Sequence, residues 1–246
     1  MKKYGLIGFP LGHSFSRGFF RRKFGDEGID ADYINFEISD ICMLTDIVRD
    51  NPDLCGLNVT IPYKTQVIAL LDELDNEAEQ IGAVNVIKFI RRDDSLKLKG
   101  FNSDIAGFSE SLRPFLKPSH RKALILGTGG ASKAVFHGLK QLAVEPTFVS
   151  RSKRNDTLTY DEITPQIIKQ HTVIVNTTPL GMFPHTDESP SLPYSALTNE
   201  HLLFDLIYNP AETQFLKKGK SFGAKTVNGS QMLELQALEA WKIWNY

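Results

Sequence analysis

A lysine in a turn-to-helix segment is the first residue whose position suggests chemistry. In NVTIPYK, residues 58–64, an extended run gives way at Pro62 to a predicted helix, with Lys64 in its first turn. The positive end of a helix dipole disfavours a cation, and both this end and burial lower the pKa of a lysine. An amine so placed can exchange a proton with a substrate oxygen near neutral pH. An ordinary exposed lysine is the alternative interpretation.

Further polar groups stand beside predicted elements in the first part of the chain. GHSFS carries two hydroxyls, Ser14 and Ser16, which suit either a helix cap or a polyhydroxylated or carboxylate ligand. GAVN places Asn85 at the opening of an apolar strand, and FNSD places Asn102 and Asp104 where a helix is expected to begin. A carboxylate such as Asp104 would fix the direction of a nearby amine. A first-turn residue stabilised by the helix dipole is the alternative.

The segment GTGGAS, residues 127–132, joins an apolar strand to a helix that is expected to begin near Ala131. Gly127, Gly129 and Gly130 let backbone N–H groups approach a pyrophosphate, and the helix N-terminus supplies positive potential. Ser132 stands where the usual pattern has Gly or Ala, and its side chain is small enough for helix–strand packing. The strand–glycines–helix order favours a dinucleotide site over a plain tight turn.

The following strand indicates which dinucleotide would bind. A site for NAD has Asp or Glu at the end of that strand, about 20 residues further on, to hold the ribose 2′-hydroxyl. Here the strand TFVS, residues 147–150, is followed by RSKR. Arg151 and Arg154 therefore stand where the acid would be, with Ser150 and Ser152 beside them. Guanidinium groups match a phosphate through paired hydrogen bonds. The missing acid favours NADP, and a solvated basic loop is the alternative.

The elements that must position these groups alternate between β-rich runs and helical patterns, which predicts an α/β fold with parallel sheet. In the first part, strands are expected at residues 4–9, 33–38 and 54–60, and a hairpin at 84–90 and 96–101. Helices are expected at residues 16–24 and 40–49. A third follows Pro62, with an apolar stripe of Val67, Leu70, Leu71 and Leu74.

The second part is expected to begin near Asn102. Its predicted helix at residues 104–115 is followed by strands at 122–126, 147–150, 172–176, 202–208 and 225–227. The last helix places Met232, Leu235, Leu238 and Trp241 at helical spacing, a stripe that indicates packing rather than a cofactor site.

Composition and charge exclude several other classes of protein. The chain has 246 residues, 41% hydrophobic and 23% charged, which is ordinary for one or two globular domains. A formal net charge of −1 gives no reason to expect nucleic acid or an anionic membrane as partner. No apolar run approaches the roughly 20 residues of a membrane span. Cys42, Cys55 and six scattered histidines make no metal set, so we expect a metal-free cytoplasmic protein.

Several segments occur in the order typical of one enzyme family. They are GFPLGHSFS, NVTIPYK, GAVN, GFNSDIAG, GTGGAS, NTTPLGM, DLIYNPAETQFL and NGSQMLELQ, and they extend over nearly the whole chain. This set resembles the shikimate dehydrogenase family. The resemblance implies an enzyme of chorismate and aromatic amino-acid biosynthesis that reversibly reduces 3-dehydroshikimate to shikimate with NADPH. It implies a substrate-binding catalytic domain, residues 1–101 with a returning C-terminal helix at 230–246, and a Rossmann NADP-binding domain at 102–229.

The resemblance also implies roles for individual residues. Lys64 and Asp104 are similar to the catalytic pair of the family. The implied substrate contacts are Ser14, Ser16, Asn58, Thr60, Asn85, Tyr208 and Gln236. The implied cofactor contacts are Gly127, Thr128, Gly129, Gly130, Ala131, Ser150, Arg151, Ser152, Arg154, Thr177, Leu206 and Gly229. We expect a small-molecule substrate, no nucleic-acid or membrane partner, and a monomer or homodimer.

The chain departs from the family pattern in three places. The family usually follows the two serines with Pro and then His-Asn, and Arg17, Phe20 and Arg21 stand there instead. Gln231 replaces the usual Gly before Met-Leu, and the chain ends soon after Trp244. Two rival hypotheses remain: a quinate or shikimate dehydrogenase that uses NAD, and a non-catalytic paralogue that binds dinucleotide or ligand.

Overall fold

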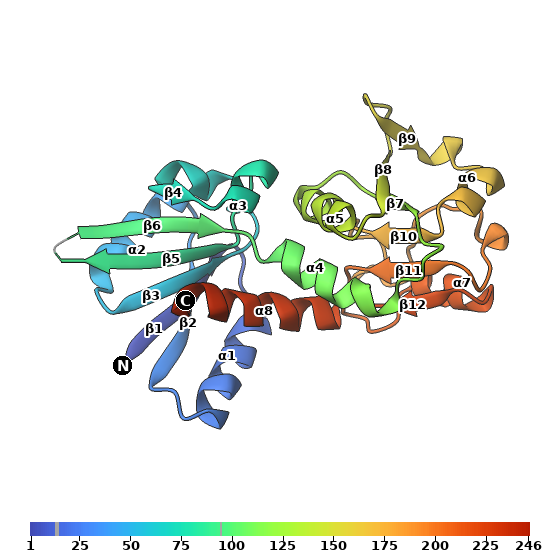
Figure 1. Ribbon diagram of the computed structural model, residues 1–246. Coiled ribbons are helices and arrows are strands. Elements are labelled where there is room, and N and C mark those ends of the chain that lie inside the picture. Colours follow the sequence, from blue (N-terminus) through green and yellow to red (C-terminus); the bar gives the residue numbers. More distant parts are fainter. Residues whose placement is uncertain (13–14, 94) are drawn as a thin grey trace. The chain divides into compact units, whose positions relative to one another are not determined.

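The computed structural model describes residues 1–12, 15–93 and 95–246. They form two compact units, each with its own sheet and hydrophobic core. Unit 1 comprises Met1–Ser103 and Gln236–Tyr246, and unit 2 comprises Asp104–Leu235. In both units helices cover the two faces of a six-stranded sheet (Figure 1). The expected α/β class with parallel strands is confirmed.

The sheet of unit 1 is mixed and has the order β2-β1-β3-β5-β6-β4. Its strands are β1 (Lys2–Gly8), β2 (Ala31–Glu37), β3 (Leu54–Val59), β4 (Glu73–Leu74), β5 (Val86–Arg92) and β6 (Ser95–Phe101). β1 pairs in parallel with β2 and β3, whereas β5 is antiparallel to β3 and β6. The predicted hairpin is therefore confirmed as β5–β6.

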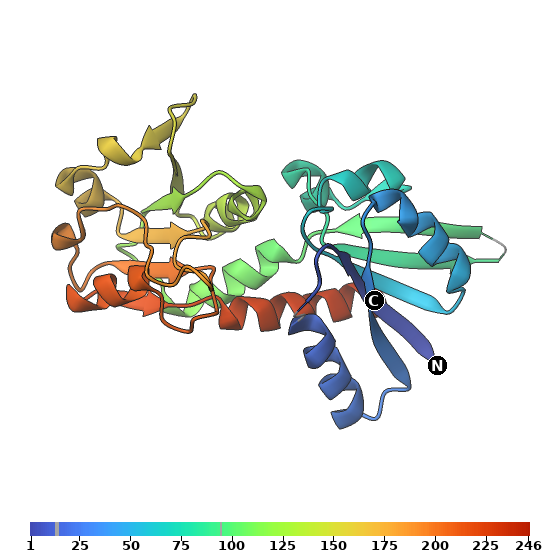
Figure 2. The same cartoon turned by 180° about the vertical axis from the view of Figure 1, so that it is seen from behind.

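Two groups of helices enclose this sheet (Figure 2). On one face lie α1 (Phe15–Asp26) and the C-terminal part of α8 (Ser230–Asn245), which pack through Phe20, Phe24 and Trp244. The other face is covered by η1 (Ile41–Met43), α2 (Leu44–Asp50), η2 (Gln66–Leu70) and α3 (Asn76–Ile81). Trp244 is anchored by a 3.1 Å hydrogen bond from its Nε1 to the Ile87 carbonyl. A Cβ at Gly56 would lie 2.3 Å from the indole, so only glycine leaves room for it there.

The sheet of unit 2 is parallel throughout, in the order β12-β11-β10-β7-β8-β9. Its strands are β7 (Lys122–Leu126), β8 (Glu145–Ser150), β9 (Thr157–Thr159), β10 (Val173–Asn176), β11 (Leu202–Asp205) and β12 (Lys225–Val227). Strand order reverses between β7 and β10. In open parallel sheets, ligands bind at the carboxyl ends of the strands beside such a reversal.

The helices of unit 2 pack on alternate side chains of these strands. Its helical elements are α4 (Asp104–Leu112), η3 (Arg113–Phe115), α5 (Gly130–Gln141), η4 (Tyr160–Glu162), α6 (Pro165–Gln170), η5 (Tyr194–Ala196) and α7 (Gln214–Ser221). Ala123 and Ile125 face the core formed with α4 and α5, whereas Leu124 and Leu126 face that formed with α6 and α7. Because helices cover both faces of the sheet, side chains pointing to either face are buried, and the strand reads as continuously apolar.

Two predicted elements of the chain were wrong. No α-helix begins at Pro62: residues 61–65 form turns, and the 3₁₀ helix η2 follows. The segment after η2 instead pairs with β6 at the sheet edge. There Asp72 N donates to the Leu98 carbonyl, and Leu98 N donates to Asp72 Oδ2. The strand expected over residues 202–208 ends at Asp205, because Ile207 N donates back to the Asp205 carboxylate.

Candidate active site

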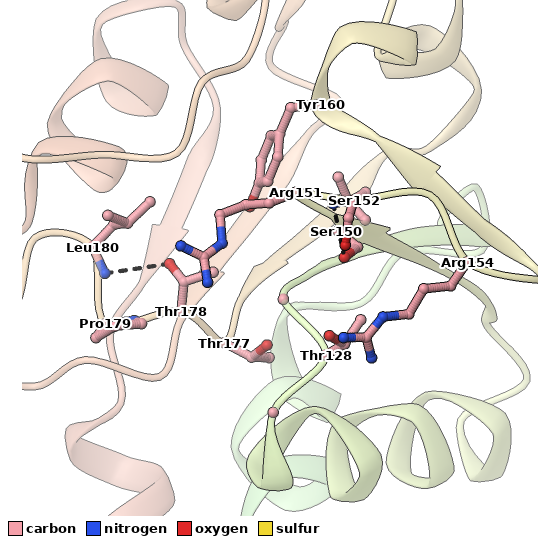
Figure 3. Close-up of a pocket in the computed structure, with 13 residues that line it drawn as sticks. Thr128, Ser150, Arg151, Ser152, Arg154, Tyr160, Thr177, Thr178, Pro179 and Leu180 are labelled. Atoms are coloured by element: carbon pink, nitrogen blue, oxygen red, sulfur yellow. Dashed lines mark hydrogen bonds between the residues drawn. The ribbon is translucent and has the colours of Figure 1, made fainter.

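A pocket lies at the carboxyl ends of β7, β8 and β10, beside the reversal of strand order in unit 2. Its lining residues are drawn in Figure 3, and its cavity has a volume of about 460 Å³. It brings together these predicted cofactor contacts: Gly127, Thr128, Gly129, Ser150, Arg151, Ser152, Arg154 and Thr177. The other four do not line it: Gly130 and Ala131 begin α5, and Leu206 and Gly229 lie near β11 and β12. The pocket has the size of a small-molecule site.

The glycines fix the floor of the pocket. Gly127 has φ +105°, and its N–H donates to the Val149 carbonyl at 2.9 Å. Gly129 precedes α5 in extended conformation, and Ser132 is fully buried in the first turn, with its Oγ donating to the Gly129 carbonyl at 2.6 Å. The N-terminus of α5 therefore meets the pocket at Gly129, as an anion site in a parallel sheet requires.

Alanine at Gly127 is expected to destabilise the chain. At φ +105° a side chain is strained, and the added Cβ would lie 2.9 Å from Thr177 Oγ1. We expect the free energy of unfolding to fall by about 1–3 kcal/mol. Gly129→Ala is the matched control, since its φ is −78° and an added Cβ meets no described atom within 4 Å. Denaturant unfolding of both variants measures the difference, and equal stability would contradict the strain assigned to Gly127.

The loop after β8 carries the positive charge of the pocket. Arg151 and Arg154 are exposed and both line the cavity, Arg151 extending toward Thr178 and Arg154 toward Thr128 in Figure 3. The Arg154 backbone is held by Thr157, whose Oγ1 accepts from its N–H at 3.0 Å. Lys153, between the two arginines, does not line the pocket, and its Nζ lies 2.8 Å from Glu162 Oε1.

Sequence reasoning missed five residues that line the pocket: Val149, Tyr160, Thr178, Pro179 and Leu180. Tyr160 arrives through η4, and burial raises its pKa, an effect that the nearby Arg151 charge opposes. Its buried hydroxyl has no hydrogen-bond partner among the described residues. Thr178, Pro179 and Leu180 directly follow Thr177 in NTTPLGM, so their position just after a predicted strand end is the sequence signal that indicates them.

In unit 1, Lys64 lies in the turn between β3 and η2 and is half-buried. The neighbouring Tyr63 fixes this turn, because it is buried and its hydroxyl donates to the Ile38 carbonyl at 2.6 Å. The Lys64 carbonyl accepts from Val84 N at 2.7 Å, which ties NVTIPYK to GAVN. Because no α-helix begins at Pro62, the expected effect of a helix dipole on the Lys64 amine is wrong. The hydrogen bond from Val84 N still places Lys64 beside GAVN.

A chain of hydrogen bonds joins several predicted substrate contacts of unit 1. The buried Tyr33 hydroxyl donates to Asn58 Oδ1 at 2.7 Å and is also bonded to the Ser16 side chain. Asn58 Nδ2 donates to the Asn85 carbonyl at 3.3 Å. The buried Asn85 side chain in turn accepts from Ser103 N at 2.7 Å and donates to Ser103 Oγ at 3.1 Å. The network therefore holds polar groups from five segments in fixed orientations.

The remaining predicted residues are distributed over both units. Thr60 follows β3 and is half-buried, and Gln236 is a half-buried residue of α8. Asp104 is the first residue of α4 in unit 2 and is 5% exposed. Tyr208 follows β11 and is 44% exposed. Ser14 lies outside the described residues.

Known proteins match this chain over the segments that carry the predicted site residues. The model of the shikimate dehydrogenase substrate binding domain matches residues 6–87. The shikimate dehydrogenase (NADP(+)) of Halothermothrix orenii is 37% identical, over 98% of this chain and 89% of the relative. This chain belongs to the shikimate dehydrogenase family.

Solved structures of the shikimate dehydrogenase fold include enzymes bound to different cofactors. Shikimate 5-dehydrogenase from Thermus thermophilus, in complex with NADP(H) and shikimate, is 28% identical with a TM-score of 0.86, covering 99% of this chain and 93% of that one. Quinate dehydrogenase from Corynebacterium glutamicum, in complex with NAD, is 26% identical with a TM-score of 0.87 and the same coverage. Fold alone therefore does not distinguish the two dinucleotides, and the pocket residues must.

The described residues of this shikimate dehydrogenase family member include neither a membrane-crossing helix nor a metal-binding cluster of side chains. Among those residues, no helix combines the length and apolar character needed to cross a bilayer. The same residues contain no group of three or more His, Cys, Asp or Glu side chains arranged to hold a metal ion.

Proposed function

We propose that this chain catalyses the reversible, NADPH-dependent reduction of 3-dehydroshikimate to shikimate. Family membership supports the reaction, and the name of the Halothermothrix orenii relative includes NADP(+). One observation carries the cofactor choice: Arg151 and Arg154 both line the pocket, and none of its described lining residues is Asp or Glu. Two guanidinium groups suit a 2′-phosphate, whereas a free 2′-hydroxyl is usually held by a carboxylate.

Each unit would bind one of the two reactants. The pocket of unit 2 suits NADP, with the pyrophosphate at the Gly127–Gly129 turn and the 2′-phosphate at the arginines. Unit 1 suits the polyhydroxylated substrate, because the hydrogen-bond network through Asn58 and Asn85 presents fixed donors and acceptors. Such preorganised groups lower the entropy lost when a substrate binds.

The residues proposed for the chemistry are Lys64 and Asp104. NADPH supplies the hydride that reaches the ketone carbon, which leaves negative charge on the ketone oxygen. The Lys64 ammonium would stabilise this charge and give up a proton to form the alcohol. In the reverse direction the Lys64 amine would accept the hydroxyl proton. Asp104 would hydrogen-bond a neighbouring substrate hydroxyl and orient the lysine.

A steady-state assay tests the proposed function directly. The purified chain should oxidise NADPH when given 3-dehydroshikimate, and reduce NADP⁺ when given shikimate. The same assays with NADH, NAD⁺ and quinate separate the rival that uses NAD. A folded chain that binds NADP⁺ but turns over none of these substrates would instead indicate the non-catalytic paralogue.

Removal of the arginines should weaken the preference for NADP. For Arg151→Ala and Arg154→Ala we expect KM for NADP⁺ to rise by about tenfold each, because a charge-assisted hydrogen bond contributes about 1.5–3 kcal/mol, discounted for exposure. KM for NAD⁺ should change little, since NAD⁺ carries no 2′-phosphate. Lys153→Ala is the matched control: it removes one positive charge from the same loop but not from the pocket. An equal rise in KM for both dinucleotides would contradict the assignment of the two arginines to the 2′-phosphate.

Two properties of the working protein remain predictions. Cytoplasmic location is supported by the two cysteines, which are both free thiols and therefore suit a reducing compartment. A monomer or homodimer remains the expected assembly, and sedimentation of the purified chain measures it.

A further inference from the structure

Asp205 carries a fully buried carboxylate at the carboxyl end of β11, in register with Asn176 at the end of β10. A carboxylate removed from water needs hydrogen bonds in place of its hydration. Three donors supply them: Asn176 Nδ2 at 3.0 Å, Ile207 N at 3.1 Å and Thr213 Oγ1 at 2.6 Å. Burial raises the pKa of Asp205 to about 6, and these bonds oppose the rise. At pH 8 the side chain is therefore ionised and can only accept hydrogen bonds.

This acceptor determines the orientation of the Asn176 amide. Because Asp205 only accepts, the NH₂ group of Asn176 must face it, and Asn176 Oδ1 then faces the opposite way. There Oδ1 accepts from Thr178 N at 3.0 Å and Thr178 Oγ1 at 2.7 Å. Thr178 Oγ1 in turn accepts from Leu180 N at 3.3 Å, the dashed bond in Figure 3. The bonds form a continuous relay from the buried carboxylate to Leu180.

The relay ends in a wall of the pocket. Thr177, Thr178, Pro179 and Leu180 all line the cavity, whereas Asn176 and Asp205 lie behind them and do not. The wall packs closely on the pocket floor, since a Cβ at Gly127 would lie 2.9 Å from Thr177 Oγ1 and 3.0 Å from Thr178 Cγ2. A change in the course of residues 177–180 would therefore alter the space available to a ligand.

We propose that Asp205 is a positioning residue for the dinucleotide: through Asn176 it holds residues 177–180 in the conformation that the cofactor requires. The proposal rests on the proposed function, because it takes the pocket to be the NADP site. The hydrogen bond that Asp205 accepts from Thr213 leads away from the pocket wall, so its loss can be compared with loss of the bond from Asn176. Thr213 caps α7, accepting from Leu216 N at 3.4 Å, and this branch contributes no bond to the relay.

Binding of NADP⁺ alone, measured by calorimetric titration at pH 8, tests the relay without requiring turnover. Asp205→Ala and Asn176→Ala should each weaken binding by about tenfold or more, because either change frees the wall. The Kd of the double variant for NADP⁺ should be no higher than the higher of the two single-variant values, because both substitutions break the same relay. Asp205→Asn should stay within about threefold of the unsubstituted chain, since its amide oxygen still accepts from Asn176 and Ile207.

Thr213→Val is the matched control, because valine keeps the shape of threonine and removes only its hydroxyl. It should lower the melting temperature and leave the Kd for NADP⁺ within about threefold. Unchanged binding in folded Asp205→Ala would overturn the proposal, as would equal weakening by Thr213→Val. If Asp205→Ala does not fold, unchanged binding in Asn176→Ala overturns it, and weakening there with Asp205→Asn intact supports it. Absence of NADP⁺ binding by the unsubstituted chain would instead overturn the proposed function, and the relay with it.

Discussion

Replacement of Lys64 by alanine is expected to lower kcat by about 10²–10⁴-fold, the usual contribution of a positioned acid–base group. KM for shikimate and for NADP⁺ should change much less, because the amine acts mainly on the charge that develops on the reacting oxygen. The turn that carries Lys64 is held by the buried Tyr63 and by the bond from Val84 N, neither of which needs the lysine side chain. The variant should therefore fold normally. Initial rates in both directions measure the effect.

Lys97→Ala is the control for the loss of a lysine from unit 1. Lys97 is exposed on β6, and its Nζ lies 2.8 Å from Glu73 Oε1 in a surface ion pair, which contributes about 0–1 kcal/mol. Its kcat should match that of the unsubstituted chain. A fully active Lys64→Ala variant would remove the catalytic assignment.

Replacement of Asp104 by asparagine should lower kcat by about 10²-fold and raise KM for shikimate. Asparagine has nearly the same shape, so the change removes the charge and half of the acceptor capacity while it preserves packing. Asp104 is 5% exposed at the first position of α4, where a buried carboxylate is costly without hydrogen bonds. The expected loss of activity follows from its proposed bond to a substrate hydroxyl. Initial rates over a range of shikimate concentrations separate kcat from KM.

A first-turn aspartate on another helix controls for the helix-dipole explanation of Asp104. Asp46 lies in the first turn of α2, and its Oδ1 is 2.8 Å from Arg49 on the exposed surface. Asp46→Asn should cost less than about 1 kcal/mol of stability and leave the kinetics unchanged. If Asp104→Asn behaves in the same way, Asp104 is only a helix-stabilising residue and the catalytic pair must be discarded.

The fold was predictable where a strand is followed directly in the sequence by residues typical of a turn or of a helix start. The β7 strand, its glycines and α5 are contiguous in sequence, and the parallel sheet follows from the alternation of such units. The region after Pro62 was not predictable from its stripe. Leu71 and Leu74 fit a helical face, but both pack against Gly100 of β6, where a Cβ would lie 2.6 and 2.9 Å from them. Sheet pairing over some 26 residues of separation outweighed the local periodicity.

The candidate site was likewise predictable where its residues are consecutive in the sequence, and not where folding brings distant residues together. The glycine turn and the arginine loop are each a few consecutive residues, so their composition alone indicated a phosphate site. Tyr160 reaches the pocket through β9 and η4, two three-residue elements that carry no strong pattern of hydrophobic periodicity. Asp205 was visible only as part of an apolar strand, because its relation to Asn176 depends on the register of β10 and β11. Such relations exist only once the sheet has formed.

Isotope transfer tests the central claim most directly. The claim is that hydride passes between NADPH and the carbonyl carbon of 3-dehydroshikimate on this chain. The experiment supplies NADPH deuterated at the reactive carbon, in ordinary water, and examines the product by mass spectrometry. Hydride transfer on this chain predicts shikimate with one deuterium atom bound to carbon when the deuterium is on the transferred face of NADPH, and none when it is on the other face. Unlabelled shikimate from both cofactors, or no shikimate at all, would contradict it.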